Sequence, residues 1–258
     1  MSFKKMLLLS VCCVLLPFLG GAGELRLLTY NIHAGIGVDR KFDLERIAKV
    51  IRDVKPHVVA LQEVDKETKR TKGVDLAKEL GQLTQMKHVF GASIPFGGGE
   101  YGNALLTSLD IRSSRVIPIP EVVPVEKRSL LVTELLFKGE PIKVVATHLC
   151  HRQEENRLKA SELIVEQFGK EPSLTFVMGD LNAVPDSKPL LALKNAGWRK
   201  PSLKEMKTIP VVNPKRQIDY VLYRPGQGQS VNVNEVRVLE EQVASDHRAL
   251  LVVLEIGE

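Results

Sequence analysis

Short apolar runs that stop abruptly at polar side chains are the feature of this sequence that most restricts its fold. Residues 58–61 are continuously apolar, as expected for a strand covered on both faces, and they lead directly into Gln62 and Glu63. Residues 174–178 lead in the same way into Gly179-Asp180-Leu181-Asn182. Buried strands that alternate with helical patterns predict an α/β fold whose strand ends carry polar groups.

Asp180 and Asn182 lie two residues apart at the mouth of their predicted strand. In an extended backbone, side chains two apart point to the same side, so both could direct oxygen at one metal ion or water molecule. The alternative is an Asx turn that only closes a loop. These two residues alone do not decide between a site and a turn.

Hydrophobic periodicity and turn residues divide the rest of the chain into further elements. Apolar residues at helical spacing follow the predicted cap Asp43, and Pro56 ends that helix. Further helices are predicted over residues 75–83, 153–168 and 187–193, and strands over 25–30, 87–92, 104–107, 130–137, 141–147, 218–222, 231–239 and 249–256. Three prolines make residues 117–125 an edge strand at best.

The first 22 residues have the pattern of a signal peptide. Lys4 and Lys5 precede an apolar run over residues 6–19, and small residues up to Ala22 then offer a cleavage site. The run is shorter than the ~20 residues that span a membrane, which disfavours a retained anchor. A lipid attached at Cys12 or Cys13 is the other alternative. We therefore expect a periplasmic or secreted protein whose single domain covers residues 23–258.

Charge and cysteine content restrict the partners only loosely. Removing Lys4 and Lys5 with the leader leaves 34 basic against 31 acidic residues, a net charge of about +3. This balance neither requires nor excludes nucleic acid. Only Cys150 remains after cleavage, so a mature monomer has no internal disulfide. We expect a monomer with no stable membrane anchor.

Polar groups of catalytic type lie at the ends of several predicted strands. They are Asn31, Glu63, His148, Asp180, Asn182, Asp246 and His247, and Asp219 lies within a further strand. Strand ends from distant parts of a sequence can meet at one edge of a sheet. The carboxylate and amide oxygens suit Mg²⁺ or Mn²⁺, and the lack of a Cys or His cluster argues against zinc.

In chain order, these residues stand in the motifs Thr-Tyr-Asn31-Ile-His, Leu-Gln-Glu63, Thr-His148-Leu, Gly-Asp180-Leu-Asn182, Ile-Asp219-Tyr and Ser-Asp246-His247. The series resembles the endonuclease/exonuclease/phosphatase superfamily over nearly the whole mature chain. That superfamily includes pancreatic-type deoxyribonucleases, abasic-site endonucleases, neutral sphingomyelinases and inositol polyphosphate phosphatases, which cleave phosphate esters with a divalent cation. The resemblance implies a four-layer α/β sandwich, with two mixed β-sheets face to face and helices outside.

The resemblance also implies roles on the metal side of the site. Glu63 would hold Mg²⁺ or Mn²⁺, which offsets charge on a phosphate oxygen. Asp180 would orient and deprotonate the attacking water. Asn31 and Asn182 would position the phosphate or the metal, and Asp246 would be a further metal ligand.

On the phosphate side, the resemblance implies roles for two histidines. His247 would contact the phosphate while Asp219 holds its imidazole in one tautomer. His148 would be a second phosphate-side donor or acid. Its partner stays open, because Glu100 lies close to, but offset from, the place of the glutamate that supports the equivalent histidine in the deoxyribonuclease branch.

Several of these residues have structural alternatives. Asp219 could be a buried acid paired with Arg216, and Asp246 could brace its own loop. His33, Asn103 and Arg128 are candidate substrate contacts. His33, like His151, could equally be an exposed loop residue. Asn103 could simply complete a turn, and Arg128 could be a solvated arginine. Cys150 reads as a small core residue rather than a nucleophile.

Three functions fit the sequence. The first is an exported, metal-dependent phosphodiesterase or phosphatase that acts on a small or lipid-linked phosphate ester. The second is a secreted nuclease that cleaves DNA or RNA. The third is a binding module that has lost catalysis, which the complete set of motifs disfavours. The mild charge and 5% aromatic content give no sign of a platform for a long polyanion, so we favour the first function.

Overall fold

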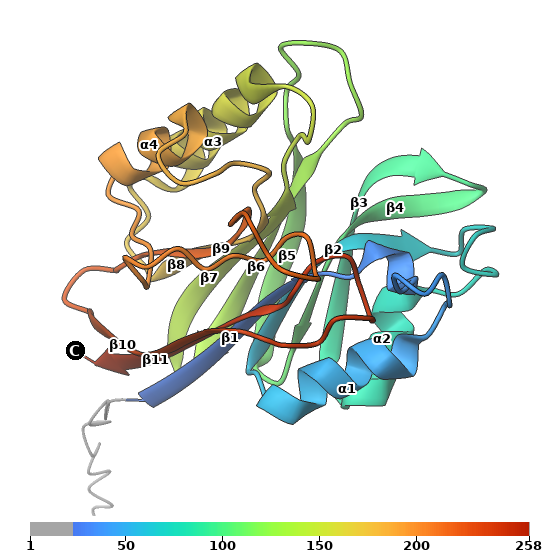
Figure 1. Ribbon diagram of the computed structural model, residues 1–258. Helices are drawn as coiled ribbons and strands as arrows, with labels where there is room; N and C mark the ends of the chain where they lie inside the picture. The colour runs from blue at the N-terminus through green and yellow to red at the C-terminus, as the bar shows by residue number, and fades with distance from the viewer. Residues whose placement is uncertain (1–22, 258) are drawn as a thin grey trace, which may run out of the picture.

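The computed structural model describes residues 23–257, so the predicted signal peptide and its two cysteines lie outside the described residues. Two mixed β-sheets of six and five strands lie face to face, and helices cover the outer face of each sheet (Figure 1). The predicted four-layer α/β sandwich is confirmed. Among the described residues, no helix is both long enough and apolar enough to cross a membrane.

The six-stranded sheet has the order β10-β11-β1-β2-β4-β3. Its strands are β1 (Gly23–Asn31), β2 (Val58–Lys66), β3 (Lys87–Phe96), β4 (Gly99–Thr107), β10 (Ser230–Val238) and β11 (Leu250–Gly257). The five-stranded sheet runs in the order β5-β6-β7-β8-β9. Its strands are β5 (Asp110–Pro118), β6 (Ser129–Phe137), β7 (Glu140–His148), β8 (Thr175–Asp180) and β9 (Asp219–Arg224).

Helices α1 (Leu44–Val54) and α2 (Leu76–Thr84) pack on the six-stranded sheet, after the short 3-10 turn η1 (His33–Gly35). The predicted cap Asp43 accepts a hydrogen bond from the Arg46 backbone N–H at 3.0 Å, which satisfies a donor that the first turn leaves free. Helices α3 (Glu154–Phe168) and α4 (Lys188–Asn195) pack on the five-stranded sheet.

Period-two geometry explains how one strand serves two cores. In β1, Leu25 and Leu27 face the core between the two sheets, whereas Leu28 and Tyr30 face α1 and α2. A strand buried on both faces has a continuous apolar run, which is the pattern of residues 58–61 at the start of β2. The two sheets are therefore pressed together, and their strand ends are held close.

Three elements differ from the sequence prediction. The edge strand is β5, which ends at Pro118 rather than starting there, and its mostly exposed face explains its weak apolar signal. Strand β3 extends to Phe96, beyond its predicted end at residue 92, and the glycines at 97 and 98 form a tight turn into β4. Strand β2 does not stop before Glu63 but continues to Lys66 through a bulge.

Candidate active site

Strand register places three of the predicted site residues side by side. His148 at the end of β7 is paired with Asp180 at the end of β8, and Asp180 is paired with Asp219 at the start of β9. Because β9 runs antiparallel to β8, its first residue lies at the end of β8. Residues far apart in the sequence thus form one row at the edge of the five-stranded sheet.

Asn31 connects this row to the other sheet. Its Nδ2 donates to Glu63 Oε1 at 3.1 Å and to Asp180 Oδ2 at 3.3 Å. Its Oδ1 accepts the His33 backbone N–H at 3.1 Å, which fixes the orientation of the amide. The structure therefore turns the amide NH₂ of Asn31, rather than its oxygen, toward the two carboxylates.

A β-bulge brings Glu63 to the site. The register between β2 and β4 shifts between Leu61 and Val64, and Glu63 has a φ of 56°. A non-glycine residue in the left-handed region costs roughly 1–3 kcal/mol, and such residues concentrate at functional sites. The bulge re-aims a half-buried carboxylate that a regular strand would direct elsewhere.

His247 is held by a carboxylate, as predicted. Its Nδ1 lies 2.9 Å from Asp219 Oδ2, which also accepts a hydrogen bond from Thr208. Burial alone would lower the pKa of His247, but the charge and hydrogen bond of Asp219, with the charges of Asp180 and Asp246, raise this pKa to about 10. The alternative partner Arg216 lines the cavity instead. His247 is therefore a cation with Nε2–H available to a substrate.

Arg128 is the partner of His148, and within residues 23–257 no glutamate is hydrogen-bonded to that histidine. Arg128 Nη1 lies 3.1 Å from His148 Nδ1. Because a guanidinium only donates, Nδ1 must accept, and the ring proton of His148 must lie on Nε2. Burial, followed by the charge of Arg128, lowers the pKa of His148 well below its ordinary value. Glu100 is occupied elsewhere, 3.3 Å from Lys66 Nζ.

Asp180 lies between the two histidines. His148 Nε2 and His247 Nε2 are 3.5 Å and 3.7 Å from its Oδ2, and the Asn182 backbone N–H donates to its Oδ1 at 2.9 Å. The last contact is the Asx turn weighed from the sequence, so the turn and the site coexist. Burial, then the charge of Asp219, raises the pKa of Asp180 above its ordinary value. Asn182 Nδ2 donates to the Leu149 carbonyl at 3.1 Å.

A cavity of about 390 Å³ opens onto these groups. Its lining includes the predicted residues Glu63, Arg128, His148, Asp180, Asn182 and His247. It also includes Arg70, Phe96, Tyr101, His151 and Arg216, which were not selected as site residues from the sequence. Arg70 is fixed by two 2.7 Å hydrogen bonds to Asp65 and stacks on Phe96. No spacing signal in the sequence marks these five residues, because they come from β3, β4 and three separate loops that only the folded chain brings together.

Five candidates lie outside the cavity lining: Asn31 and Asp219, which contact lining residues directly, and His33, Asn103 and Asp246. His33 Nδ1 lies 3.0 Å from the Ile36 carbonyl oxygen, and Asn103 is buried and donates to the Ser129 carbonyl at 3.3 Å. Asp246 accepts a hydrogen bond from Ser245 Oγ at 3.3 Å, which is the loop-bracing contact considered as its alternative. Cys150 is buried and free, and its Sγ accepts the Gln153 backbone N–H.

The donor atoms fit a hard divalent cation. Asp180, Asp219 and His247 offer ligand atoms within 4.8 Å of one another, so this buried group could hold a metal. Asp219 and His247 are already hydrogen-bonded to each other, however. Glu63 and Asp180 are joined through Asn31, and both carboxylates line the cavity. These two are the better oxygen donors for Mg²⁺ or Mn²⁺.

Comparison with known proteins identifies the family of the chain. The model of the Endonuclease/Exonuclease/phosphatase family matches residues 28–247. That range begins inside β1 and ends at His247, so it contains the whole row of site residues. No curated protein matches the chain.

Solved structures share the fold. An endonuclease/exonuclease/phosphatase from Beutenbergia cavernae DSM 12333 has a TM-score of 0.75 at 24% identity, over 91% of this chain and 72% of that one. The Bacteroides thetaiotaomicron VPI-5482 mannosyl-6-phosphatase Bt3783 has a TM-score of 0.73 at 16% identity, over 89% of this chain and 99% of that one. D. rerio TDP2 complexed with single strand DNA product has a TM-score of 0.72 at 17% identity, over 90% of this chain and 98% of that one. At these identities the likeness shows the fold.

Proposed function

Because the chain belongs to the Endonuclease/Exonuclease/phosphatase family, we propose that it is an exported phosphoric ester hydrolase that uses Mg²⁺ or Mn²⁺. Members of the family are divalent-metal-dependent phosphoesterases or nucleases. The observation that carries the proposal is that Glu63, His148, Asp180 and His247 line one cavity, with Asp219 hydrogen-bonded to His247 behind them. A base, two phosphate donors and a metal ligand are then present together.

Asp180 is the proton acceptor in this proposal. It is nearly fully buried, and its raised pKa makes it a better base near neutral pH than an exposed aspartate. Asn31 and the Asn182 backbone hold its two oxygens in place. A water held at Asp180 attacks the phosphorus in line with the leaving oxygen, and Asp180 takes its proton.

The two histidines bind the phosphate from either side. His247 presents a charged Nε2–H, because Asp219 stabilises the imidazolium. His148 presents a neutral Nε2–H, because Arg128 occupies its Nδ1. Both donors face the position where negative charge develops on the phosphate oxygens, and such preorganised donors stabilise that charge.

Glu63 and Asp180 would hold the divalent cation, and the Asn31 amide, which donates to both carboxylates, would orient them. When bound, the cation supplies positive charge to a phosphate oxygen and to the leaving oxygen. Asp246 has no place in the cavity lining, so it supports the loop that carries His247 in this proposal.

We place the substrate among small or lipid-linked phosphate esters. The mild net charge gives little attraction for a long polyanion, and the catalytic cavity is compact. Two structural neighbours are named as a mannosyl-6-phosphatase and as TDP2 with a single-strand DNA product, so both ester classes occur on this fold.

Hydrolysis of bis-p-nitrophenyl phosphate tests the activity. We expect hydrolysis with Mg²⁺ or Mn²⁺ and none with excess chelator. A parallel panel of plasmid DNA, phospholipids, sugar phosphates and inositol phosphates tests the substrate class. Rapid plasmid nicking with slow turnover of the other esters would identify the protein as the nuclease alternative.

A further inference from the structure

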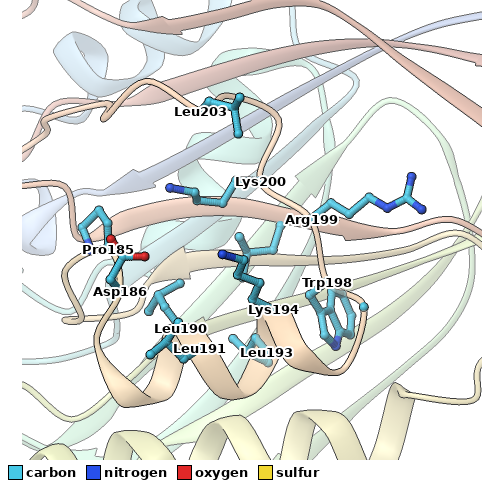
Figure 2. Close-up of a pocket in the computed structure, with 12 residues that line it drawn as sticks. Pro185, Asp186, Leu190, Leu191, Leu193, Lys194, Trp198, Arg199, Lys200 and Leu203 are labelled. Atoms are coloured by element: carbon cyan, nitrogen blue, oxygen red, sulfur yellow. The ribbon is translucent and has the colours of Figure 1, made fainter.

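A second cavity lies beside α4 and the segment that follows it (Figure 2). Its volume is about 590 Å³, larger than the catalytic cavity and well within the range of ligand pockets. No residue lines both cavities. The second cavity is therefore a separate space, formed by α4, by residues 197–203 and by Leu222 of β9.

The inner wall of this cavity is apolar. Leu190, Leu193, Trp198 and Leu222 are buried members of the core that joins α3 and α4 to the five-stranded sheet. At the rim, Leu203 is 98% exposed. A single exposed leucine is ordinary, but one at the mouth of an apolar hollow offers contact area to an occupant. The shape and lining suit a ligand with an aliphatic body.

Two lysines give the cavity a charged side. The amines of Lys194 and Lys200 are turned toward the side where Pro185 and Asp186 lie, whereas Arg199 extends away (Figure 2). Neither lysine forms an ion pair with another residue in the part of the chain that the structure describes. Asp186 is the one acid in the lining. Two cations against one anion leave the mouth of the cavity positive.

We propose that this cavity binds a single-chain anionic amphiphile, with its aliphatic chain against the leucines and Trp198 and its carboxylate or phosphate head at Lys194 and Lys200. Charge complementarity selects the head, and the apolar wall selects the chain. A hollow with a buried floor fits one chain that enters it. The inference does not depend on the catalytic proposal, because the two cavities share no residue.

Trp198 makes the proposal directly measurable. It is the single tryptophan of the chain, and it lines this cavity. A terminally brominated medium-chain fatty acid quenches tryptophan on contact. With the purified protein, we expect saturable quenching below the micelle concentration of the acid. The brominated alcohol of the same length should bind at least about tenfold more weakly, and bromoacetate should not quench.

Charge reversal separates head recognition from unspecific apolar contact. In the double variant Lys194→Glu with Lys200→Glu, affinity for the brominated acid should fall by about tenfold or more, and affinity for the alcohol should not change. Lys170→Glu, an exposed lysine outside the cavity, is the matched control and should bind as wild type. The double variant and Lys170→Glu should both hydrolyse bis-p-nitrophenyl phosphate at the wild-type rate, which keeps this result separate from the catalytic proposal.

Other outcomes would overturn the proposal. Equal quenching by acid and alcohol, or full quenching in the double variant, would show that the cavity does not recognise an anionic head group. Quenching only by vesicles of brominated phosphatidylglycerol would identify a membrane-contacting surface instead. A dimer in sedimentation that the double charge reversal abolishes, without quenching by the acid, would identify an interface between copies of this chain.

Discussion

At the scale of single residues, the contact between Arg128 and His148 is the arrangement that sequence reasoning left open. A carboxylate partner would favour a charged histidine, whereas Arg128 keeps the ring neutral and places its proton on Nε2. The same site therefore holds one charged and one neutral histidine on either side of Asp180. Arg128 keeps His148 a neutral donor, and Asp219 keeps His247 a charged donor.

Replacing Arg128 should disturb His148 before it disturbs the fold. In Arg128→Met, Nδ1 loses its donor and the nearby positive charge, so the pKa of His148 should rise toward its ordinary value. We expect kcat for a phosphodiester to fall by about tenfold to a hundredfold. Ring NMR signals of His148 in metal-free protein measure the titration. Glu126→Gln, which removes only a carboxylate that pairs with Arg128, is the control. An unchanged His148 titration in Arg128→Met would contradict the assigned tautomer.

The sequence motifs identified residue types but not orientations. Asn31 and Asp180 are the last residues of β1 and β8, Glu63 lies at the bulge in β2, and His247 lies in the loop before β11. The amide of Asn31 points the other way from a metal ligand, since the backbone of His33 takes its oxygen. Such a choice depends on one local hydrogen bond, which no residue pattern encodes.

At the scale of elements, the close approach of β7 and β8 sets the distance between His148 and Asp180. Gly179 has a φ of 151°, and a Cβ there would lie 1.8 Å from the Thr147 carbonyl oxygen. Since Thr147 and Gly179 are register partners next to the His148–Asp180 pair, the glycine lets the two site residues meet. Close backbone approach is a recognised role of glycine in a strand.

Gly179→Ala should therefore reduce both stability and activity. Gly139→Ala is the matched control, because Gly139 also has a positive φ but has open space where its Cβ would lie. The control should lose only about 1–2 kcal/mol of unfolding free energy and keep its activity. Gly179→Ala should lose at least about 2 kcal/mol more. Urea unfolding measures both. Equal losses in the two variants would show that β7 and β8 separate without cost.

The junction of α1 and β2 predicts an acid-sensitive contact away from the site. His57 Nδ1 accepts the Arg26 backbone N–H at 3.0 Å, so protonation would break this bond. Burial, then the charge of Arg26, lowers the pKa of His57 from 6.5. Below that value the unfolded chain binds the proton more readily than the folded one. The stabilisation is thus present above 6.5 and lost as the pH falls below it.

His57→Asn keeps an acceptor without a titrating ring. Between about pH 7.5 and pH 5, its urea midpoint should fall less than that of the wild type. Identical falls in the two proteins would show that His57 does not contribute to the acid sensitivity.

Most helices and strands of the fold were predictable from the periodicity of apolar residues. The bulge in β2 and the edge strand β5 were not, because neither has an apolar repeat.

At the scale of the whole molecule, the site forms where two sheets meet. Glu63 comes from the six-stranded sheet and Asp180 from the five-stranded sheet, and Asn31 joins them. A cation bound by both carboxylates would therefore link the halves of the fold. The sequence predicted α/β layers, but the choice of a four-layer sandwich came from family resemblance, since strand order depends on long-range pairing.

Metal binding should consequently stabilise the entire fold. A ligand that binds only the native state adds about 2.7 kcal/mol at a concentration about one hundred times its Kd. We expect Tm to rise with Mg²⁺ or Mn²⁺ and to return with chelator. In Glu63→Gln the rise should be mostly lost, whereas Glu67→Gln, an exposed neighbour in sequence, should keep it. An equal rise in Glu63→Gln would place the cation elsewhere.

The central claim is that Asp180 accepts a proton from the water that attacks a phosphate ester. The most direct test is the rate of bis-p-nitrophenyl phosphate hydrolysis by Asp180→Asn at saturating Mg²⁺, beside the wild type and Asp186→Asn, an exposed acid outside the catalytic cavity. We predict a fall of about a thousandfold for Asp180→Asn and wild-type rates for Asp186→Asn. Hydrolysis at the wild-type rate by folded Asp180→Asn would contradict the account.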